Sequence, residues 1–196
     1  MRERAWVPPA GETVTLLPTG ERWDAVRTHT AIAARAFDVL DGIEGSAAII
    51  DPHTCTAYWL LPPREAALAP WEQWERLRPY VTVLPARTDT SATYLGVPPA
   101  GRHNSPGLHW RVPGGWSGLY LSRPAILSAA LAPAVLAVHG ADALPLRCQV
   151  CDRAVERDRA VTAVGRRHPD DPVRRRLTAH RACARHARLT IKGPAQ

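Results

Sequence analysis

The two segments Cys148-Gln-Val-Cys151 and His180-Arg-Ala-Cys183 decide how the C-terminal part of this chain folds. The first is a CxxC motif and the second an HxxC motif, with 28 residues between them. Thiolates and imidazole are the ligands that Zn²⁺ takes in tetrahedral structural sites, in pairs of about this spacing. A CxxC motif brings two sulfur atoms together across a tight turn. The sequence therefore predicts a structural zinc site whose four ligands are Cys148, Cys151, His180 and Cys183.

A helix is expected to carry the second ligand pair. Asp171 is suited to the N-cap of a helix and Pro172 to its first position. Gly193-Pro194 is expected to prevent any continuation of this helix.

Two other histidines are alternative ligands. In the expected helix, His180 and His186 point about 120° apart with Cys183 between them, so one ion can bind Cys183 with either histidine. The apolar residues of the helix lie on the side of His180, which favours His180. His186 remains an alternative, as does His168 in the preceding loop.

The arrangement resembles a known class of zinc fingers. A CxxC turn, a β-hairpin expected at residues 159–167 and a helix with the HxxC motif together resemble a treble-clef finger. This resemblance implies a zinc-stabilised fold, and such fingers bind DNA, RNA or proteins.

A redox-active CxxC motif would open a helix after a strand, whereas here Asp152-Arg153 leads into an extended, Val-rich stretch.

Positive charge is concentrated in the same part of the chain. Residues 1–146 carry 12 basic and 13 acidic side chains, whereas residues 147–196 carry 13 basic and 5 acidic ones. Four arginines of the expected helix share one face: Arg174, Arg181, Arg185 and Arg188. Such a stripe is typical of contact with nucleic-acid phosphates, and the alternative is a solvated helix face. No aromatic residue follows Tyr120, so base stacking by this part is not expected.

The preceding residues alternate short apolar stretches with turns. Strands are predicted at residues 47–51, 55–61, 81–84, 93–97 and 108–112. Helical stretches are predicted at residues 22–40, 71–77 and 123–131, the last ended by Pro133. Short connections favour antiparallel pairing. The predicted fold class is α+β, with a mainly antiparallel sheet, flanking helices and a small C-terminal zinc-binding module.

The domain organisation follows from these stretches. It comprises an extended lead-in at residues 1–20, an α+β domain at 21–133, a linker at 134–146 and a basic zinc-binding module at 147–196.

Three short segments resemble the sheet of primase-polymerase N-terminal domains from actinobacterial mobile elements. They are Ala57-Tyr-Trp-Leu-Leu-Pro-Pro63, Thr93-Tyr-Leu-Gly-Val-Pro-Pro-Ala100 and Pro106-Gly-Leu-His-Trp-Arg-Val-Pro113. The family's catalytic histidine would fall on Thr56, and Asp51 and Glu44 are isolated carboxylates, whereas nucleotidyl transfer needs a pair to hold Mg²⁺. The resemblance therefore implies a catalytically silent bacterial relative, with no catalytic residues assigned.

The sequence predicts a cytoplasmic accessory or regulatory protein that binds nucleic acid and a structural Zn²⁺ ion. A protein-interaction adaptor is the second hypothesis and a primase-polymerase-type enzyme the third. No membrane partner is expected, because the longest apolar stretch, residues 124–138, is too short to span a bilayer. Cys55 is left over and is expected to be a small buried side chain.

Overall fold

The computed structural model describes residues 6–63, 74–84, 93–103, 106–116, 118–167 and 170–195. The chain divides into two compact units, an N-terminal unit at Met1–Ala141 and a C-terminal unit at Asp142–Gln196. Their boundary lies inside the segment 134–146, which the sequence assigns to a linker. No helix in the described ranges is long and apolar enough to cross a membrane.

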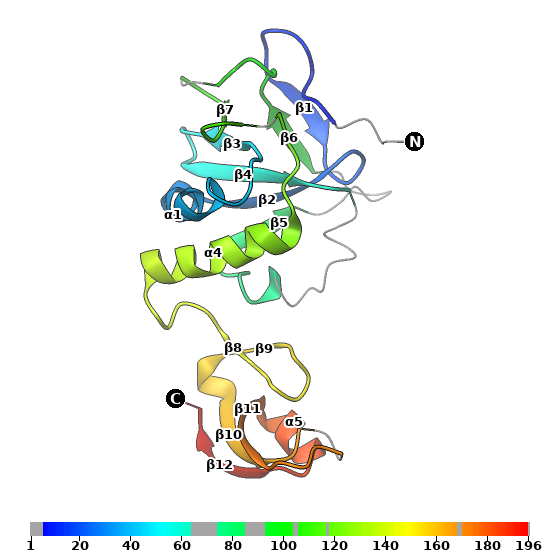
Figure 1. The fold of residues 1–196 in the computed structure, drawn as a ribbon, viewed down its shortest axis with the longest axis vertical. Coiled ribbons are helices and arrows are strands. Elements are labelled where there is room, and N and C mark those ends of the chain that lie inside the picture. The colour runs from blue at the N-terminus through cyan, green and yellow to red at the C-terminus, as the bar shows by residue number, and fades with distance from the viewer. Residues whose placement is uncertain are drawn as a thin grey trace. The chain divides into compact units, whose positions relative to one another are not determined.

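The N-terminal unit is built on a five-stranded antiparallel sheet (Figure 1). Its strand order is β5-β2-β4-β3-β7. The strands are β2 (Asp24–His29), β3 (Ala48–Asp51), β4 (Thr56–Leu61), β5 (Val81–Leu84) and β7 (His109–Arg111). The predicted α+β class with a mainly antiparallel sheet is confirmed, and four of these strands lie where the sequence predicts them.

Helices cover one face of this sheet and a two-stranded ribbon covers the other. Figure 1 shows α1 (Thr30–Leu40) beside α4 (Pro124–His139) on one side, and β1 (Thr15–Pro18) paired with β6 (Tyr94–Val97) on the other. Adjacent residues of β4 demonstrate the two faces, because strand side chains alternate. The Trp59 ring lies 5.2 Å from the ring of Phe37 in α1, whereas Leu60 packs in a cluster with Leu95 of β6.

Residues 24–29 form a strand, so the helical stretch predicted throughout residues 22–40 is wrong in its first part. They form β2, which pairs with β4 on one side and β5 on the other. The β-branched Val26 and Thr28 point into the unit while Arg27 and His29 stay exposed, which is the two-residue period of a strand. The helix begins only at Thr30, where the His29 side chain accepts a hydrogen bond from the Ala31 N–H.

The helix α4 and the N-terminal lead-in also differ in detail from the sequence predictions. Helix α4 continues to His139 although Pro133 lies inside it, because its apolar residues beyond the proline, among them Ala134 and Val135, remain buried. The lead-in, expected to be extended, contains the strand β1, which pairs with β6. The helix expected at residues 71–77 falls partly outside the described residues.

The C-terminal unit contains a small hairpin and a three-stranded antiparallel sheet. Strands β8 (Leu146–Arg147) and β9 (Ala154–Val155) form the hairpin. The sheet has the order β11-β10-β12 and comprises β10 (Ala160–Gly165), β11 (Arg175–His180) and β12 (Thr190–Pro194). A short 3-10 turn (Arg157–Arg159) precedes β10, and helix α5 (Arg181–His186) joins β11 to β12.

The single long helix expected from Pro172 to about Gly193 is wrong. Strand β11, the six-residue α5 and strand β12 occupy this segment. The physical reason is pairing with β10: Leu177 and Ala179 are buried while Arg176 is exposed, so the apolar period is two rather than 3.6. The hairpin expected within residues 159–167 is also wrong, because those residues contain one strand, β10, and the hairpin is formed with β11.

Candidate metal centre

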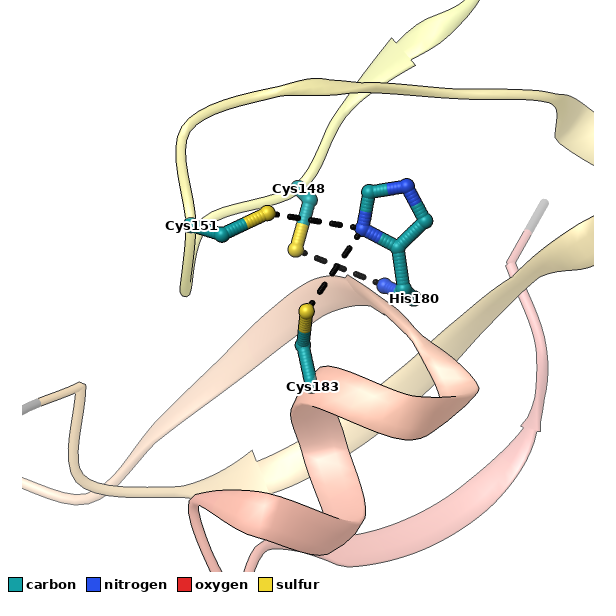
Figure 2. Close-up of side chains that lie close together, drawn as sticks. All are labelled: Cys148, Cys151, His180 and Cys183. Atoms are coloured by element: carbon teal, nitrogen blue, oxygen red, sulfur yellow. Dashed lines mark hydrogen bonds between the residues drawn. The ribbon is translucent and has the colours of Figure 1, made fainter.

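The four predicted ligands converge at one place in the C-terminal unit (Figure 2). The sulfur atoms of Cys148, Cys151 and Cys183 and a ring nitrogen of His180 all lie within 4.8 Å of one another. Such a group can hold a metal ion, and it is the one group of three or more potential ligands found among the residues that the structure describes.

Hydrogen bonds of the turn between β8 and β9 position Cys148 and Cys151. The Cys148 N–H donates to the Arg153 carbonyl at 2.8 Å, and the Asp152 N–H donates to the Cys148 carbonyl at 2.8 Å. Asp152 adopts the left-handed conformation with φ 62°, which aspartate tolerates better than most residues. Its carboxylate also forms ion pairs with Arg147 and Arg167. Both the backbone N–H and the side chain of Asp152, the residue after Cys151, are therefore fixed by contacts.

Gln149 joins this turn to the sheet. Its backbone N–H donates to the Thr178 carbonyl at 2.8 Å, and its side-chain oxygen accepts from the Thr178 N–H at 2.7 Å. Thr178 lies two residues before His180 on β11. The first ligand pair is therefore attached to the strand that carries the third ligand.

His180 and Cys183 come from the junction of β11 and α5. His180 ends the strand and is the N-cap residue of the helix, and Cys183 lies in its first turn. The His180 Nδ1 atom is 3.5 Å from the Cys151 sulfur and 3.7 Å from the Cys183 sulfur. In tetrahedral coordination, Zn–S bonds of about 2.3 Å and a Zn–N bond of about 2.0–2.1 Å place sulfur and nitrogen about 3.6 Å apart. The observed separations fit such a site.

The other ring nitrogen of His180 faces a backbone carbonyl. Nε2 lies 3.0 Å from the Ala154 oxygen, which can only accept, so Nε2 carries the proton and donates it. This contact leaves the lone pair on Nδ1, which faces the sulfur atoms. A second hydrogen bond that fixes the tautomer and ring orientation is typical of metal-binding histidines.

The local electrostatics prevents the three thiols from ionising together without a cation. Burial raises the pKa of the Cys148 thiol, but hydrogen bonds from the backbone N–H groups of Cys151, His180 and Val150 outweigh it and lower the pKa to about 6. Burial raises the pKa of Cys183, and its contact with Cys151 and the negative charges of Cys148 and Cys151 raise it further, to about 11. A bound cation would favour all three thiolates.

The alternative ligands lie elsewhere. His186 is at the opposite end of α5 from His180 and lines a surface groove rather than the cluster. His168 lies outside the described residues. Cys55 belongs to the N-terminal unit, where it is exposed at the turn between β3 and β4, so the expectation of a buried side chain is wrong. All four cysteines are free thiols.

The arginines predicted to form a helical stripe are exposed but do not share one helix. Arg181 and Arg185 lie on α5, Arg174 precedes β11, and Arg188 follows α5. Arg174 and Arg188 instead line a groove at the end of the β10–β11 hairpin that is opposite His180. We call this groove the hairpin groove. Its lining includes Gly165, Arg166, Arg167, Arg174, His186 and Arg188. The charge of this segment is evident in the sequence, whereas the groove depends on how two turns meet.

The two isolated carboxylates of the N-terminal unit each have a local role. Asp51 accepts hydrogen bonds from the His53 N–H at 3.0 Å and the Thr54 hydroxyl at 2.7 Å within the β3–β4 turn. Glu44 is buried and pairs with Arg123 at 2.9 Å. These contacts stabilise the fold, and neither carboxylate pairs with the other.

Metal binding at this site should release protons and weaken as the pH falls. Near neutral pH, the pKa of about 11 keeps Cys183 protonated in the metal-free protein, and a metal must displace that proton. We expect the affinity for zinc to fall about tenfold or more for each pH unit between about pH 8 and 6, and more steeply below the pKa of Cys148. Competition with a chromophoric chelator measures this dependence, and an affinity independent of pH would contradict it.

In comparisons with known proteins, no family model, no curated protein and no solved structure matches this chain.

Proposed function

We propose that residues 142–196 form a zinc-stabilised finger of the treble-clef type, and that this finger binds the phosphate backbone of nucleic acid. The convergence of three thiols and the His180 Nδ1 atom at tetrahedral separations carries the metal part of the proposal. Soft thiolates with one imidazole form a donor set that selects zinc over harder cations such as Mg²⁺ or Ca²⁺. The order of elements supports the finger type, because a CxxC turn and a hairpin precede a helix that supplies the last ligand.

The charge distribution supports the nucleic-acid part. Residues 147–196 carry 13 basic and 5 acidic side chains, and Asp152 is already engaged by Arg147 and Arg167. The resulting positive field attracts polyanions and favours counterion release on binding. The four candidate residues are exposed: Arg174, Arg181, Arg185 and Arg188. Because no Phe, Tyr or Trp follows Tyr120, base stacking does not contribute, and we expect phosphate contacts to dominate and binding to be largely independent of base sequence.

The N-terminal unit then serves as a catalytically silent partner of the finger, in an accessory or regulatory protein. The local roles of Asp51 and Glu44 support this, because neither is free to join a carboxylate pair that holds Mg²⁺. The competing hypothesis is an adaptor whose finger binds another protein.

The salt dependence of binding tests the proposal directly. If four arginines contact phosphates, the plot of log affinity against log salt should have a slope of about −3 to −4, measured by fluorescence anisotropy with a labelled oligonucleotide. Arg35, exposed on α1, offers a control, because Arg35→Ala should leave the slope unchanged. Absence of binding at low salt would favour the adaptor hypothesis.

A further inference from the structure

The hairpin groove is lined by several positively charged side chains. It has a volume of about 660 Å³ and lies between the far end of the β10–β11 hairpin and the turn that ends α5. Arginines enter it from both sides. Arg166 and Arg174 come from the hairpin and Arg188 from the turn after α5. The groove is separate from the metal centre, because the register pairs Ala160 with His180 at one end of the hairpin and Gly165 with Arg175 at the other.

Among the described residues, most of the arginines of the groove lack an ion-pair partner. Arg167 forms an ion pair with Asp152. Within the ranges that the structure describes, Arg166, Arg174 and Arg188 have no carboxylate within 4.0 Å. Guanidinium groups that face a common hollow repel one another unless an anion lies between them. The groove therefore favours a ligand with closely spaced negative charges.

Arg188 occupies a backbone position that usually belongs to glycine. The turn after α5 is a Schellman motif, in which the Leu189 N–H donates to the Ala184 carbonyl at 2.8 Å and the Arg188 N–H donates to the Arg185 carbonyl at 3.0 Å. This motif requires a left-handed residue, and Arg188 adopts φ 53°. A side chain at this position costs free energy that glycine would avoid. Backbone strain of this kind clusters at functional sites, although Cys55 and Asp152 adopt the same conformation in turns of this chain.

Gly165 explains how the turn comes so close to the hairpin. A Cβ atom at Gly165 would lie 2.3 Å from the Leu189 Cδ2 atom, so glycine lets the Leu189 side chain pack directly on β10 in its present position. This contact brings the neighbouring Arg188 beside Arg166 and Arg167.

We propose that the hairpin groove is the phosphate-binding site of the finger, and that Arg166, Arg174 and Arg188 hold the phosphodiester backbone of a nucleic-acid strand in it. This inference rests on the proposed function and narrows it, because it assigns the contacts to the groove rather than to the exposed arginines of α5. Guanidinium groups bind phosphate oxygens in a bidentate manner. A polynucleotide presents phosphates at short, regular spacing, whereas an acidic peptide would need a run of consecutive carboxylates.

Two double variants of equal charge change separate the groove from the helix. Arg174→Ala with Arg188→Gly removes two groove arginines, and Arg181→Ala with Arg185→Ala removes two arginines of α5. Each phosphate contact that is lost flattens the salt slope. With a labelled single-stranded oligothymidylate, we expect the groove variant to flatten the slope by about 1.4 units and the helix variant to leave it nearly unchanged, measured by anisotropy between about 50 and 200 mM salt.

Arg188→Gly alone gives a second readout that a purely structural arginine would not give. Glycine relieves the left-handed strain, so the zinc-loaded variant should melt at the same or a higher temperature while it binds the oligonucleotide more weakly. If Arg188→Gly lowers the zinc content, the double variant Arg166→Ala with Arg174→Ala serves as the groove variant in the comparison with the helix variant. Both of these side chains are exposed, so their replacement should not disturb the fold.

The outcomes distinguish this inference from the proposed function. Equal flattening in the groove and helix variants would overturn the groove as the site and leave nucleic-acid binding intact. Competition by polyglutamate as effective as that by unlabelled oligothymidylate would overturn the choice of a phosphodiester ligand. No binding by the intact protein at low salt would overturn both proposals.

Discussion

Replacing Cys148 with serine should remove zinc from the protein and unfold the C-terminal unit while the N-terminal unit stays folded. Cys148 is fully buried, and its sulfur is one of the four converging ligand atoms. The core of this unit is small and rich in alanine, with Ala163, Ala179 and Ala184 at its centre. Structural zinc contributes about 10–16 kcal/mol to the folding of comparable small fingers, so a core of this size does not replace it.

Elemental analysis and hydrogen exchange measure this result. We expect about one zinc per chain in the intact protein and none in the Cys148→Ser variant, whose amides in residues 142–195 should lose protection. Cys55→Ser is the matched control, because Cys55 is an exposed thiol of the other unit and its loss should leave the zinc content unchanged. Full zinc content in the Cys148→Ser variant, or no transition metal in the intact protein, would contradict the prediction.

Trp110→Ala should destabilise the N-terminal unit by about 3–5 kcal/mol without loss of zinc from the C-terminal unit. Trp110 is 0% exposed and lies at the centre of the core between the sheet and the β1–β6 ribbon. Its indole N–H donates to the Pro98 carbonyl at 3.0 Å, and its ring lies 4.8 Å from that of Tyr120. Truncation removes this packing and leaves the Pro98 carbonyl without its donor.

Urea unfolding followed by fluorescence gives the change in stability, and elemental analysis gives the zinc content. Tyr94→Ala serves as the control, because Tyr94 is 57% exposed on β6 and its replacement should change stability by no more than about 0.5 kcal/mol. Loss of zinc together with unfolding of the N-terminal unit would show that the two units do not fold independently.

The cluster of potential metal ligands could be predicted from the sequence because each pair of ligands lies within four consecutive residues. The CxxC and HxxC spacings each bring two ligand atoms together whatever the intervening chain does. The preference for His180 over His186, which agrees with the observed cluster, follows from an incorrect helix. His180 joins the cluster from the end of a strand, and its orientation depends on the Ala154 carbonyl, a contact that no spacing reveals.

The strands were predictable where proline or glycine bounds a short apolar stretch, as for β3, β4 and β5. The two incorrect helix predictions rest on local signals, namely the apolar spacing within residues 22–40 and the helix-start residues Asp171 and Pro172. In both segments, tertiary pairing overrides these signals: β2 lies between two partner strands, and β11 pairs with β10 along its whole length. The hairpin groove could not be predicted from the sequence for the same reason, because it forms only where β10 and the turn after α5 meet.

The β10–β11 hairpin connects the two candidate sites of the C-terminal unit thermodynamically. His180 lies at one end of β11, and Arg174 of the groove immediately precedes the other end. A metal ion that requires the hairpin to be formed and an anion that requires it as well must favour each other's binding. The factor by which zinc raises the affinity for the anion then equals the factor by which the anion raises the affinity for zinc.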